Sequence, residues 1–422
     1  MAKANSELFY HWEDYYANYD SVFGGKWYFR MSWYRVVAFA LIGLMLFSMA
    51  YRLSRGLGPA TNLNDSWPWG LWIAFDDLCG IALAAGGFFT VFVAHILNLK
   101  QYKYIARASL ITAWFGYIVV SLGVLMDLGR WYNFWRPFVS WGYHSWLFVV
   151  LLCVIAYQGV MTLQFGHILF ERVNVPRLKE IFDKILPVVF VAGLVIALLH
   201  QSALGNLYVA MIDRQHPLWW SMLIGTFFFL SAIFVGPAMC VVEGVLAAKA
   251  YNKDFRHEVP LLEPLLKVSM WVMIIYLAAR LIDLAARREF LRMFEGSVPS
   301  NLFLLEIILG VIVPIILIAK PSTRKSVPGM VAAAFLMVGG LMLNRMNVVF
   351  TSMYQAMGGS YFPFWMELSI SVGLVSLLIM AYCFIVENFK IMPEEHEHHH
   401  EHREEHHTEH HSEHLELQHA HH

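Results

Sequence analysis

Residues 71–97 read LWIAFDDLCGIALAAGGFFTVFVAHIL, an apolar stretch that two adjacent acids, Asp76 and Asp77, interrupt near its start. At 1.5 Å per residue, a helix of this length crosses the roughly 30 Å hydrocarbon core of a bilayer. The apolar residues run on without alternation, which favours a helix over a strand of a membrane β-barrel. The stretch therefore predicts a membrane-spanning helix that carries carboxyl groups.

Nine further stretches have the same character, and the composition agrees with them. Hydrophobic residues make up 58% of the 422 residues and charged residues only 14%, whereas soluble domains are about 25% charged. We therefore expect an all-α integral membrane protein with about ten transmembrane helices. The predicted spans cover residues 33–52, 71–97, 105–127, 143–170, 179–200, 217–247, 264–286, 300–320, 327–348 and 364–388.

Basic residues are concentrated in the even-numbered connections between these spans, as Lys100, Lys103 and Arg107 show for the second connection. The odd-numbered connections contain no lysine. Because cytoplasmic loops of bacterial inner-membrane proteins are rich in Lys and Arg, we predict that both termini and the even-numbered connections lie in the cytoplasm. The odd-numbered connections then face the periplasm.

The two ends of the chain differ from the spans. Residues 1–32 begin polar and acidic, unlike a signal peptide, and continue rich in aromatic residues; we interpret them as a cytoplasmic segment at the membrane interface. Residues 393–422 hold 13 of the 20 histidines with nine Glu and one Arg, which predicts a disordered cytoplasmic tail. Three interpretations of the tail stay open: an appended tag, a loose binder of divalent metal, or a solvated, pH-responsive segment.

Ionisable side chains in or beside the spans gather at the odd-numbered connections. Such side chains are costly inside a bilayer and therefore mark a functional site by default. A polar layer near one membrane face suits a quinone, which resides in lipid and exchanges protons and electrons near water. Each residue also has a structural interpretation, as a helix-pairing carboxylate or an interfacial polar group. The candidate quinone-binding and catalytic residues are Asp76, Asp77, Asp127, Arg130 and His144.

A second set of residues is a candidate for the pocket or for a proton path, which acids in a helix bundle can form. Arg280 and Asp283 lie one turn apart and can equally form a structural ion pair. Three arginines follow at the predicted periplasmic edge and could dock an acidic partner. The second set is His200, Glu243, Arg280, Asp283, Glu306 and Glu367; the docking arginines are Arg287, Arg288 and Arg292.

Several other classes of site are not expected from the sequence. The four cysteines lie in four separate spans, which argues against a disulfide framework or a metal cluster. Outside the histidine-rich tail the chain has no HExxH motif, and it has no phosphate-binding glycine loop. We expect no metal site, no electron carrier of its own and no nucleic-acid partner.

Two alternatives to a quinone site stay open. The histidines His95, His167, His144 and His200 could ligate two b-type haems. Ten spans with ionisable residues could also form a secondary transporter, although transporter sites lie near the bilayer centre rather than at one face.

Five motifs carry a resemblance to a known family: PWGLWIAFDDL (68–78), MDLGRWYN (126–133), HQSALGNLY (200–208), HPLWW (216–220) and YFPFWMEL (361–368). With them the chain resembles the NrfD/polysulfide-reductase membrane-subunit family, in particular the ten-span branch of hydrogenase-2-type anchors and of the quinone reductase complex of sulfate reducers. The resemblance covers about residues 33–390. It implies two four-helix bundles plus two extra helices, with the first bundle and a quinone pocket in 33–200 and the second bundle and extra helices in 201–392.

The resemblance also implies a function. It predicts a haem-free subunit of the bacterial inner membrane that reacts with menaquinone and docks a periplasmic ferredoxin-like iron–sulfur subunit. Molybdopterin-type, hydrogenase or multihaem cytochrome c subunits would complete the complex. In this sequence Asp76, Arg130 and His144 match quinone-pocket positions, and Arg280 and Asp283 resemble proton-route positions. Proton uptake from the cytoplasm would make turnover electrogenic. The terminal segments lie outside the family pattern.

Overall fold

The structure is a computed structural model that describes residues 29, 31–65, 67, 69–173, 176–252, 254–357, 361–389 and 391. Most of the predicted interfacial segment (1–32) and the whole predicted histidine-rich tail (393–422) lie outside these residues, so both interpretations stay predictions.

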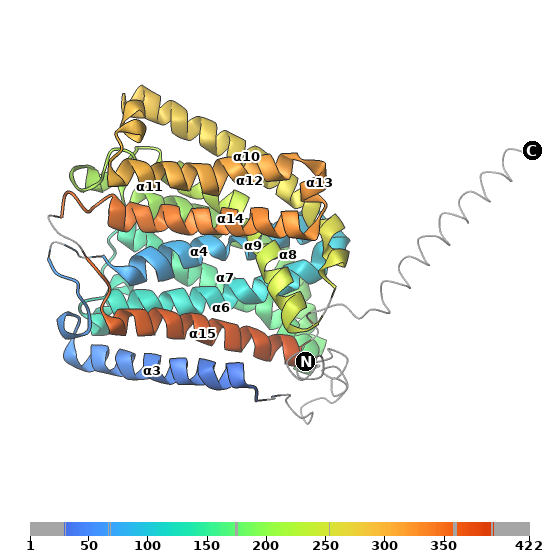
Figure 1. Cartoon of the computed structure of the whole chain (residues 1–422). Helices are drawn as coiled ribbons and strands as arrows, with labels where there is room; N and C mark the ends of the chain where they lie inside the picture. The colour runs from blue at the N-terminus through green and yellow to red at the C-terminus, as the bar shows by residue number, and fades with distance from the viewer. Residues whose placement is uncertain are drawn as a thin grey trace, which may run out of the picture.

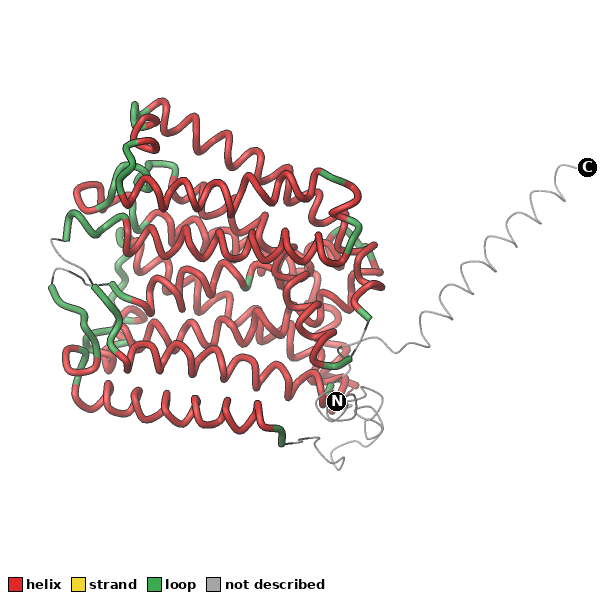
Figure 2. The backbone as a smooth tube through the Cα atoms, viewed as in Figure 1, coloured by secondary structure: helices red, strands yellow, loops and turns green. Residues whose placement is uncertain are grey.

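Within the described residues, ten helices are long and apolar enough to cross a membrane, which agrees with the predicted number of spans. Across the described ranges, the regular secondary structure is entirely helical (Figure 2). The predicted all-α membrane class is therefore confirmed, and the chain is a multi-pass membrane protein. The arrangement in two four-helix bundles plus two extra helices stays a prediction. The α-helices are α3 (Trp33–Arg55), α4 (Gly80–Leu83), α5 (Ala85–Val91), α6 (Lys103–Asp127), α7 (Trp146–Val173), α8 (Pro176–Asn206), α9 (Ile224–Ala250), α10 (Val259–Ala286), α11 (Val298–Ile307), α12 (Val313–Ala319), α13 (Pro321–Arg324), α14 (Val327–Met346) and α15 (Trp365–Asn388).

Helix α9 lies at the centre of the protein, in contact with α5, α8, α10 and α14. Its central position explains why its sequence is apolar on all sides. The last helix, α15, packs against α3 and α6, so the first and last spans are neighbours (Figure 1). The outer helix α3 exposes much of its apolar surface, as expected for a helix that faces lipid.

Small residues allow the closest helix contacts, as is common in membrane bundles. A Cβ atom placed on Gly340 of α14 would lie 2.1 Å from the Gly310 Cα atom. Gly310 belongs to η10 (Ile308–Ile312), the π-helical turn that joins α11 to α12. The two backbones therefore touch at this pair of glycines.

The second span is not a uniform α-helix. It begins as the π-helix η2 (Trp72–Cys79), continues as α4 and α5, and ends in a second π-helical turn, η3 (Phe92–Ile96). A further π-helical turn, η11 (Asn347–Thr351), extends α14. Such wide turns are frequent at functional sites, and the two acids Asp76 and Asp77 lie inside the first of them.

The sixth span begins later than predicted. Helix α9 starts at Ile224, whereas the apolar pattern starts at 217. The intervening residues form turns, in which the amides of Trp219 and Trp220 donate to the His216 carbonyl while other backbone groups bond to distant parts of the chain. The His216 amide donates to the Ser352 hydroxyl (3.0 Å), and the Leu218 carbonyl accepts from Arg280 (3.0 Å).

Candidate functional site

Asp76 and Asp77 are both buried, with 5% and 4% of their surface exposed, and their side chains have different surroundings. The Ser371 hydroxyl on α15 donates to Asp76 Oδ2 at 2.6 Å. Asp76 also packs against α6, where a Cβ atom on Gly123 would lie 3.0 Å from its own. Asp76 therefore joins η2 to α6 and α15.

Asp77 makes no comparable hydrogen bond with the described residues. For its buried Oδ1 atom the described part of the chain supplies no hydrogen-bond partner, and the same holds for His200 Nε2, Tyr157 Oη and Tyr208 Oη. We call these four the open atoms. Buried polar atoms are paired in the great majority of cases, so several open ones together call for an explanation, such as a ligand or a water.

Tyr117 contacts two of the residues that carry the open atoms. His200 Nδ1 lies 3.1 Å from the Tyr117 hydroxyl, and the Tyr117 ring lies 4.4 Å from that of Tyr157. Asp77 lies near enough for its charge to act on the hydroxyl groups of Tyr117 and Tyr208. We name these five residues, Asp77, Tyr117, Tyr157, His200 and Tyr208, the Asp77 cluster. They come from η2, α6, α7, α8 and the turn that follows α8.

Three other predicted pocket residues lie further out, at the end of α6 and in the connection to α7. Asp127 is half-buried and interacts electrostatically with Arg52, which donates to the Met126 carbonyl at 2.8 Å. Arg130 and His144 are exposed. The structure therefore does not bring Arg130 or His144 into the buried group around Asp77.

Sequence reasoning missed two residues here. Arg52 is fully buried near the end of α3, and its Nε atom donates to a backbone carbonyl at the carboxyl end of α6. The sequence signal for Arg52 is a positive charge at the end of the first apolar stretch. Tyr208 lies within a quoted motif, but nothing in the sequence distinguishes it from an interfacial aromatic residue.

Glu367, in the first turn of α15, has a structural setting. Its Oε2 atom accepts from the backbone N–H groups of Asn62 (2.9 Å) and Phe364 (2.8 Å), and its Oε1 atom accepts from the Tyr361 hydroxyl. A Glu at the third helical position commonly reaches back in this way to cap its helix. Glu367 therefore fixes the start of α15 to the connection that precedes η2.

Glu306 on α11 is the centre of a second buried polar network. It accepts from Trp219 Nε1 (3.0 Å), Asn344 Nδ2 (2.6 Å) and Asn347 Nδ2 (3.0 Å). A small cavity beside Glu306 and Asn344 has a volume of about 10 Å³, which is about enough for one water molecule.

Arg345 lies beside this network. It donates to Asn344 Oδ1 and to the Ser231 hydroxyl, both at 2.6 Å, and its guanidinium group lies 3.5 Å from the centre of the Phe228 ring. The Tyr208 ring lies near the same Phe228 ring, with 6.3 Å between the ring centres. Arg345 and Tyr208 are therefore both neighbours of Phe228.

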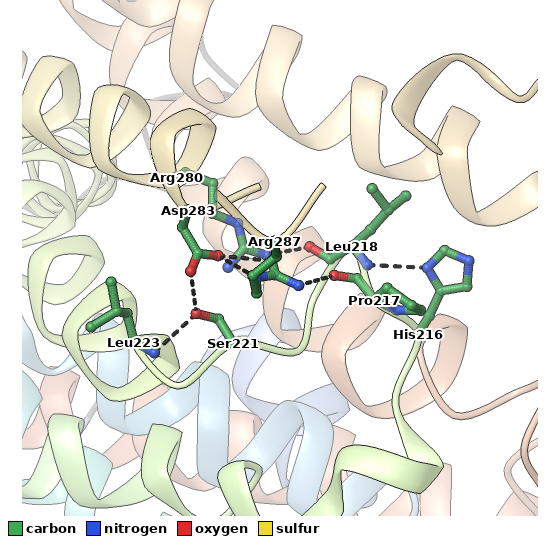
Figure 3. A network of polar contacts seen from close by, with 8 residues as sticks. All are labelled: His216, Pro217, Leu218, Ser221, Leu223, Arg280, Asp283 and Arg287. Atoms are coloured by element: carbon green, nitrogen blue, oxygen red, sulfur yellow. Dashed lines mark hydrogen bonds and ion pairs between the residues drawn. The ribbon is translucent and has the colours of Figure 1, made fainter. Parts of the chain in front are cut away.

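Figure 3 shows the contacts of α10 with the turns before α9. Asp283 pairs with Arg287 through Oδ2 (2.7 Å) and accepts from the Ser221 hydroxyl (2.8 Å). Arg280 instead donates to the Leu218 carbonyl and lies 4.8 Å from the centre of the Phe227 ring. The i,i+3 pairing of Arg280 with Asp283 considered from the sequence is therefore replaced by the i,i+4 pair of Asp283 with Arg287.

The predicted docking arginines have different environments. Arg287 is half-buried and also donates to the Pro217 carbonyl at 2.8 Å, so it holds the turns before α9. Arg292 pairs with Glu289. Arg288 is exposed, with a left-handed backbone conformation (φ 62°).

Glu243 lies apart from these groups, toward the end of α9 that leads into a basic connection. It accepts from the Thr112 hydroxyl at 2.8 Å, and a Cβ atom on the adjacent Gly244 would lie 2.5 Å from Glu258 Oε2. At the same end, Glu387 pairs with Arg35. These acids are therefore not part of the Asp77 cluster.

A larger cavity, of about 300 Å³, opens between η3, α6, α7 and α8. It lies at the end of the second span that leads into Lys103 and Arg107, away from Asp77. Neither this cavity nor the small one, as the described residues form them, is lined by Asp76, Asp77 or His200. The described residues also contain no group of three or more His, Cys, Asp or Glu side chains that could hold a metal ion.

Comparisons with known proteins support a family assignment. The family model "Polysulphide reductase, NrfD" matches residues 59–356. The chain is 29% identical to the "Probable Ni/Fe-hydrogenase 2 b-type cytochrome subunit" of Escherichia coli, over 85% of this chain and 93% of that protein. It is 28% identical to the "Menaquinone reductase, integral membrane subunit" of Nitratidesulfovibrio vulgaris, over 87% and 93%.

A third relative is a subunit of the selenate reductase of Mesobacillus selenatarsenatis, which is 25% identical over 87% of this chain and 96% of that protein. The family match covers more than half of the chain, and the ten apolar helices agree with it. The chain therefore belongs to the NrfD family of integral membrane proteins, as the resemblance of its five motifs indicated.

Proposed function

We propose that this protein is the quinone-reactive membrane subunit of a respiratory oxidoreductase complex, with menaquinone as its substrate. Family membership supports this function, since relatives are named as subunits of menaquinone reductase and of selenate reductase. The proposed partner is a periplasmic ferredoxin-like iron–sulfur subunit, wired to a molybdopterin-type, hydrogenase or multihaem cytochrome c subunit. The proposed location is the bacterial inner membrane, with both termini in the cytoplasm.

The observation that carries the proposal is the group of open atoms in the Asp77 cluster. A quinone offers two carbonyl acceptors, and its reduced form offers two hydroxyl donors. His200 Nε2 and the Tyr208 hydroxyl can donate to a carbonyl oxygen, and Asp77 Oδ1 can accept from a hydroxyl group. A few convergent polar groups in apolar surroundings are the usual composition of a small-molecule site.

Space for the quinone ring requires side-chain movement. The cavities described above do not reach the Asp77 cluster. Tyr208 contacts the Trp69 ring edge at 5.6 Å between ring centres, and both residues lie next to connections rather than inside long helices. We infer that Tyr208 and Trp69 move apart when the ring enters.

The same residues can handle the protons of the reaction. Reduction of a quinone takes up two electrons, supplied by the extrinsic partner, and two protons, which the site must provide. His200 is held by Tyr117 at Nδ1, so its Nε2 atom can pass a proton while its ring orientation stays fixed. Asp77 can supply or accept the other proton. Uptake of these protons from the cytoplasm would make turnover electrogenic.

Binding and turnover of defined variants test the proposal. Asp77→Asn removes the carboxylate, and Asp65→Asn is a matched control because Asp65 is exposed in the connection that precedes the same span. We expect Asp77→Asn to weaken binding of a short-chain menaquinone analogue to the purified protein, and to lower quinone-dependent turnover, while co-purification of partner subunits is unchanged. Equal affinity in Asp77→Asn and Asp65→Asn would refute the assignment.

A dihaem b-type subunit is the second candidate, because one relative is named a b-type cytochrome subunit. The first candidate pair of haem ligands is His144 with His200; His144 is exposed, whereas His200 is buried and bonded to Tyr117. The second candidate pair is His95 with His167; His167 Nδ1 lies 3.0 Å from Asp183, and His95 is stacked on Phe190. A haem b band in the reduced-minus-oxidised spectrum of the purified chain would favour this candidate over the haem-free one.

A further inference from the structure

Arg52, near the end of α3, is a fully buried cation with one nitrogen left unbonded. Its Nε atom donates to the Met126 carbonyl at 2.8 Å, and its Nη2 atom donates to the Leu128 carbonyl. The remaining nitrogen, Nη1, is buried and has no hydrogen-bond partner in the part of the chain that the structure describes. Burial of a charged group is costly unless its donors are bonded, so Nη1 points to a bound molecule as its acceptor.

Asp127 is the neighbour of this guanidinium group. It stands between the two residues whose carbonyls Arg52 binds, so the Arg52 side chain lies against the backbone on both sides of Asp127. The opposite charges of the two side chains act on each other. The Asp127 Oδ1 atom is also buried, and it too lacks a hydrogen-bond partner within the described ranges. We call these two residues the Arg52–Asp127 pair. One oxygen atom that accepts a hydrogen bond and donates another would satisfy Nη1 and Oδ1 together.

The pair lies one helical turn from the contact between α6 and Asp76. Gly123, four residues before Asp127, faces that acid, since a Cβ atom placed on it would lie 3.0 Å from the Asp76 Cβ atom. Residues four apart on a helix lie on the same face, so Asp127 continues the side of α6 that faces η2. Asp127 also lies near enough for its charge to act on the Asp77 carboxyl group and on the Tyr208 hydroxyl. The pair therefore borders the Asp77 cluster.

The surroundings of the pair are apolar on the inner side and exposed on the outer side. Leu53, Trp72 and Met126 belong to one apolar cluster. Asp127 itself is partly exposed, and Leu128, directly after it, is exposed by 40%. A lipid-soluble ligand can therefore approach from the end of α6 and find apolar contacts beside the two charges.

We propose that the Arg52–Asp127 pair binds one of the two ring oxygens of the menaquinone substrate. This inference rests on the proposed function, and it gives Arg52 a direct contact with the substrate. In the oxidised form, the carbonyl oxygen accepts from Arg52 Nη1. In the reduced form, the hydroxyl group at the same ring position also donates to Asp127 Oδ1. The other ring oxygen, on the opposite side of the ring, is left for the Asp77 cluster.

Binding of a short-chain menaquinone analogue to the purified full chain tests the assignment, with the analogue oxidised in one titration and reduced by dithionite in the other. Asp127→Asn keeps the size of the side chain and removes its charge. We expect this variant to bind the reduced form roughly tenfold more weakly, because a hydrogen bond to a charged group is lost. Its affinity for the oxidised form should change much less, since the carbonyl oxygen bonds to Arg52. A purely structural role would weaken both forms equally.

Variants of two arginines on α3 complete the experiment. Arg52→Gln should weaken binding of both forms at least tenfold, because Nη1 donates to the carbonyl and to the hydroxyl oxygen alike. Arg55→Gln is the matched control, since Arg55 is exposed one turn further along the same helix, and it should leave both affinities unchanged. Arg52→Gln also removes the bonds to the end of α6, whereas Asp127→Asn keeps them and so separates binding from folding.

The outcomes distinguish this inference from the proposed function. Wild-type affinity of Asp127→Asn for the reduced analogue, or equal weakening of the two forms, would overturn the inference and leave a bridging water as the partner of the pair. If Asp77→Asn weakens binding in the same titrations, the proposed function stands even then. A wild-type chain that binds neither form of the analogue would refute the proposed function and this inference together.

Discussion

His200 and Tyr117 meet between α8 and α6, with 3.1 Å between His200 Nδ1 and the Tyr117 hydroxyl. This contact fixes the imidazole ring and leaves Nε2 as one of the open atoms. A histidine held at one nitrogen and open at the other is suited to proton transfer. In the proposed quinone site, the pair would supply a defined donor for a substrate carbonyl.

Replacement of His200 tests this role. We expect His200→Phe to lower quinone-dependent turnover roughly hundredfold, the range in which a positioned acid or base contributes. Tyr117→Phe removes only the contact that orients the ring, and its effect should be smaller. Turnover in membranes that contain the assembled complex measures both variants, and equal loss in the two would mean that the ring orientation alone matters.

The glycine pair of η10 and α14 offers a test of the packing. Gly340→Ala places a Cβ atom 2.1 Å from the Gly310 Cα atom, so the helices must separate, at a cost of roughly 1–3 kcal/mol. Gly339→Ala is the control on the same helix, because its Cβ would meet no atom within 4 Å among the described residues. Thermal unfolding in detergent should show a lower midpoint for the first variant only.

The environment of His216, in the turns before α9, predicts a pH dependence. Burial, and then the charge of Arg292, lower the pKa of this imidazole below its usual value of 6.5. The folded chain therefore binds a proton at His216 less readily than the unfolded chain. Its contribution to stability is present above about pH 6.5 and is lost as the pH falls below that value.

Thermal unfolding between pH 7.5 and 5 measures this contribution. The midpoint of His216→Gln should fall less than that of the wild type over this range, because glutamine does not titrate. Parallel curves for the two proteins would remove His216 from the pH response.

Arg287 and Arg288 are adjacent but should behave differently. Arg287 bonds to Asp283 and Pro217, so Arg287→Gln should destabilise the fold by roughly 1–3 kcal/mol. Arg288 is exposed, and Arg288→Gln should leave thermal unfolding unchanged while weakening association with an acidic partner, most strongly at low salt. A stability loss in Arg288→Gln would contradict the docking role.

The sequence predicted the ten spans because each is a long apolar run, and hydropathy needs no tertiary information. It also indicated Asp76 and Asp77, since carboxyl groups stand out in an apolar stretch. It could not predict which of the two is bonded to Ser371, because that depends on how α15, almost 300 residues away, packs on η2.

Other features depend on local backbone that residue patterns do not encode. The π-helical start of the second span changes the direction of both acids, and no residue in 71–79 marks it. Likewise, the partner of Asp283 is set by the turns before α9, where Ser221 and Pro217 place Arg287 rather than Arg280 beside the carboxylate. Arg130 is a predicted pocket residue because it follows Asp127 by three positions and matches a pocket position of the family, but neither signal reports that its side chain is exposed.

The position of a bound quinone tests the central claim most directly. A structure of the purified chain with a short-chain menaquinone analogue, solved by electron cryomicroscopy, would show where the ring lies. We predict density for the ring within hydrogen-bonding distance of Asp77 Oδ1 and His200 Nε2, with Tyr208 displaced. Density in the cavity beside Lys103 and Arg107, with the Asp77 cluster unchanged, would contradict the account.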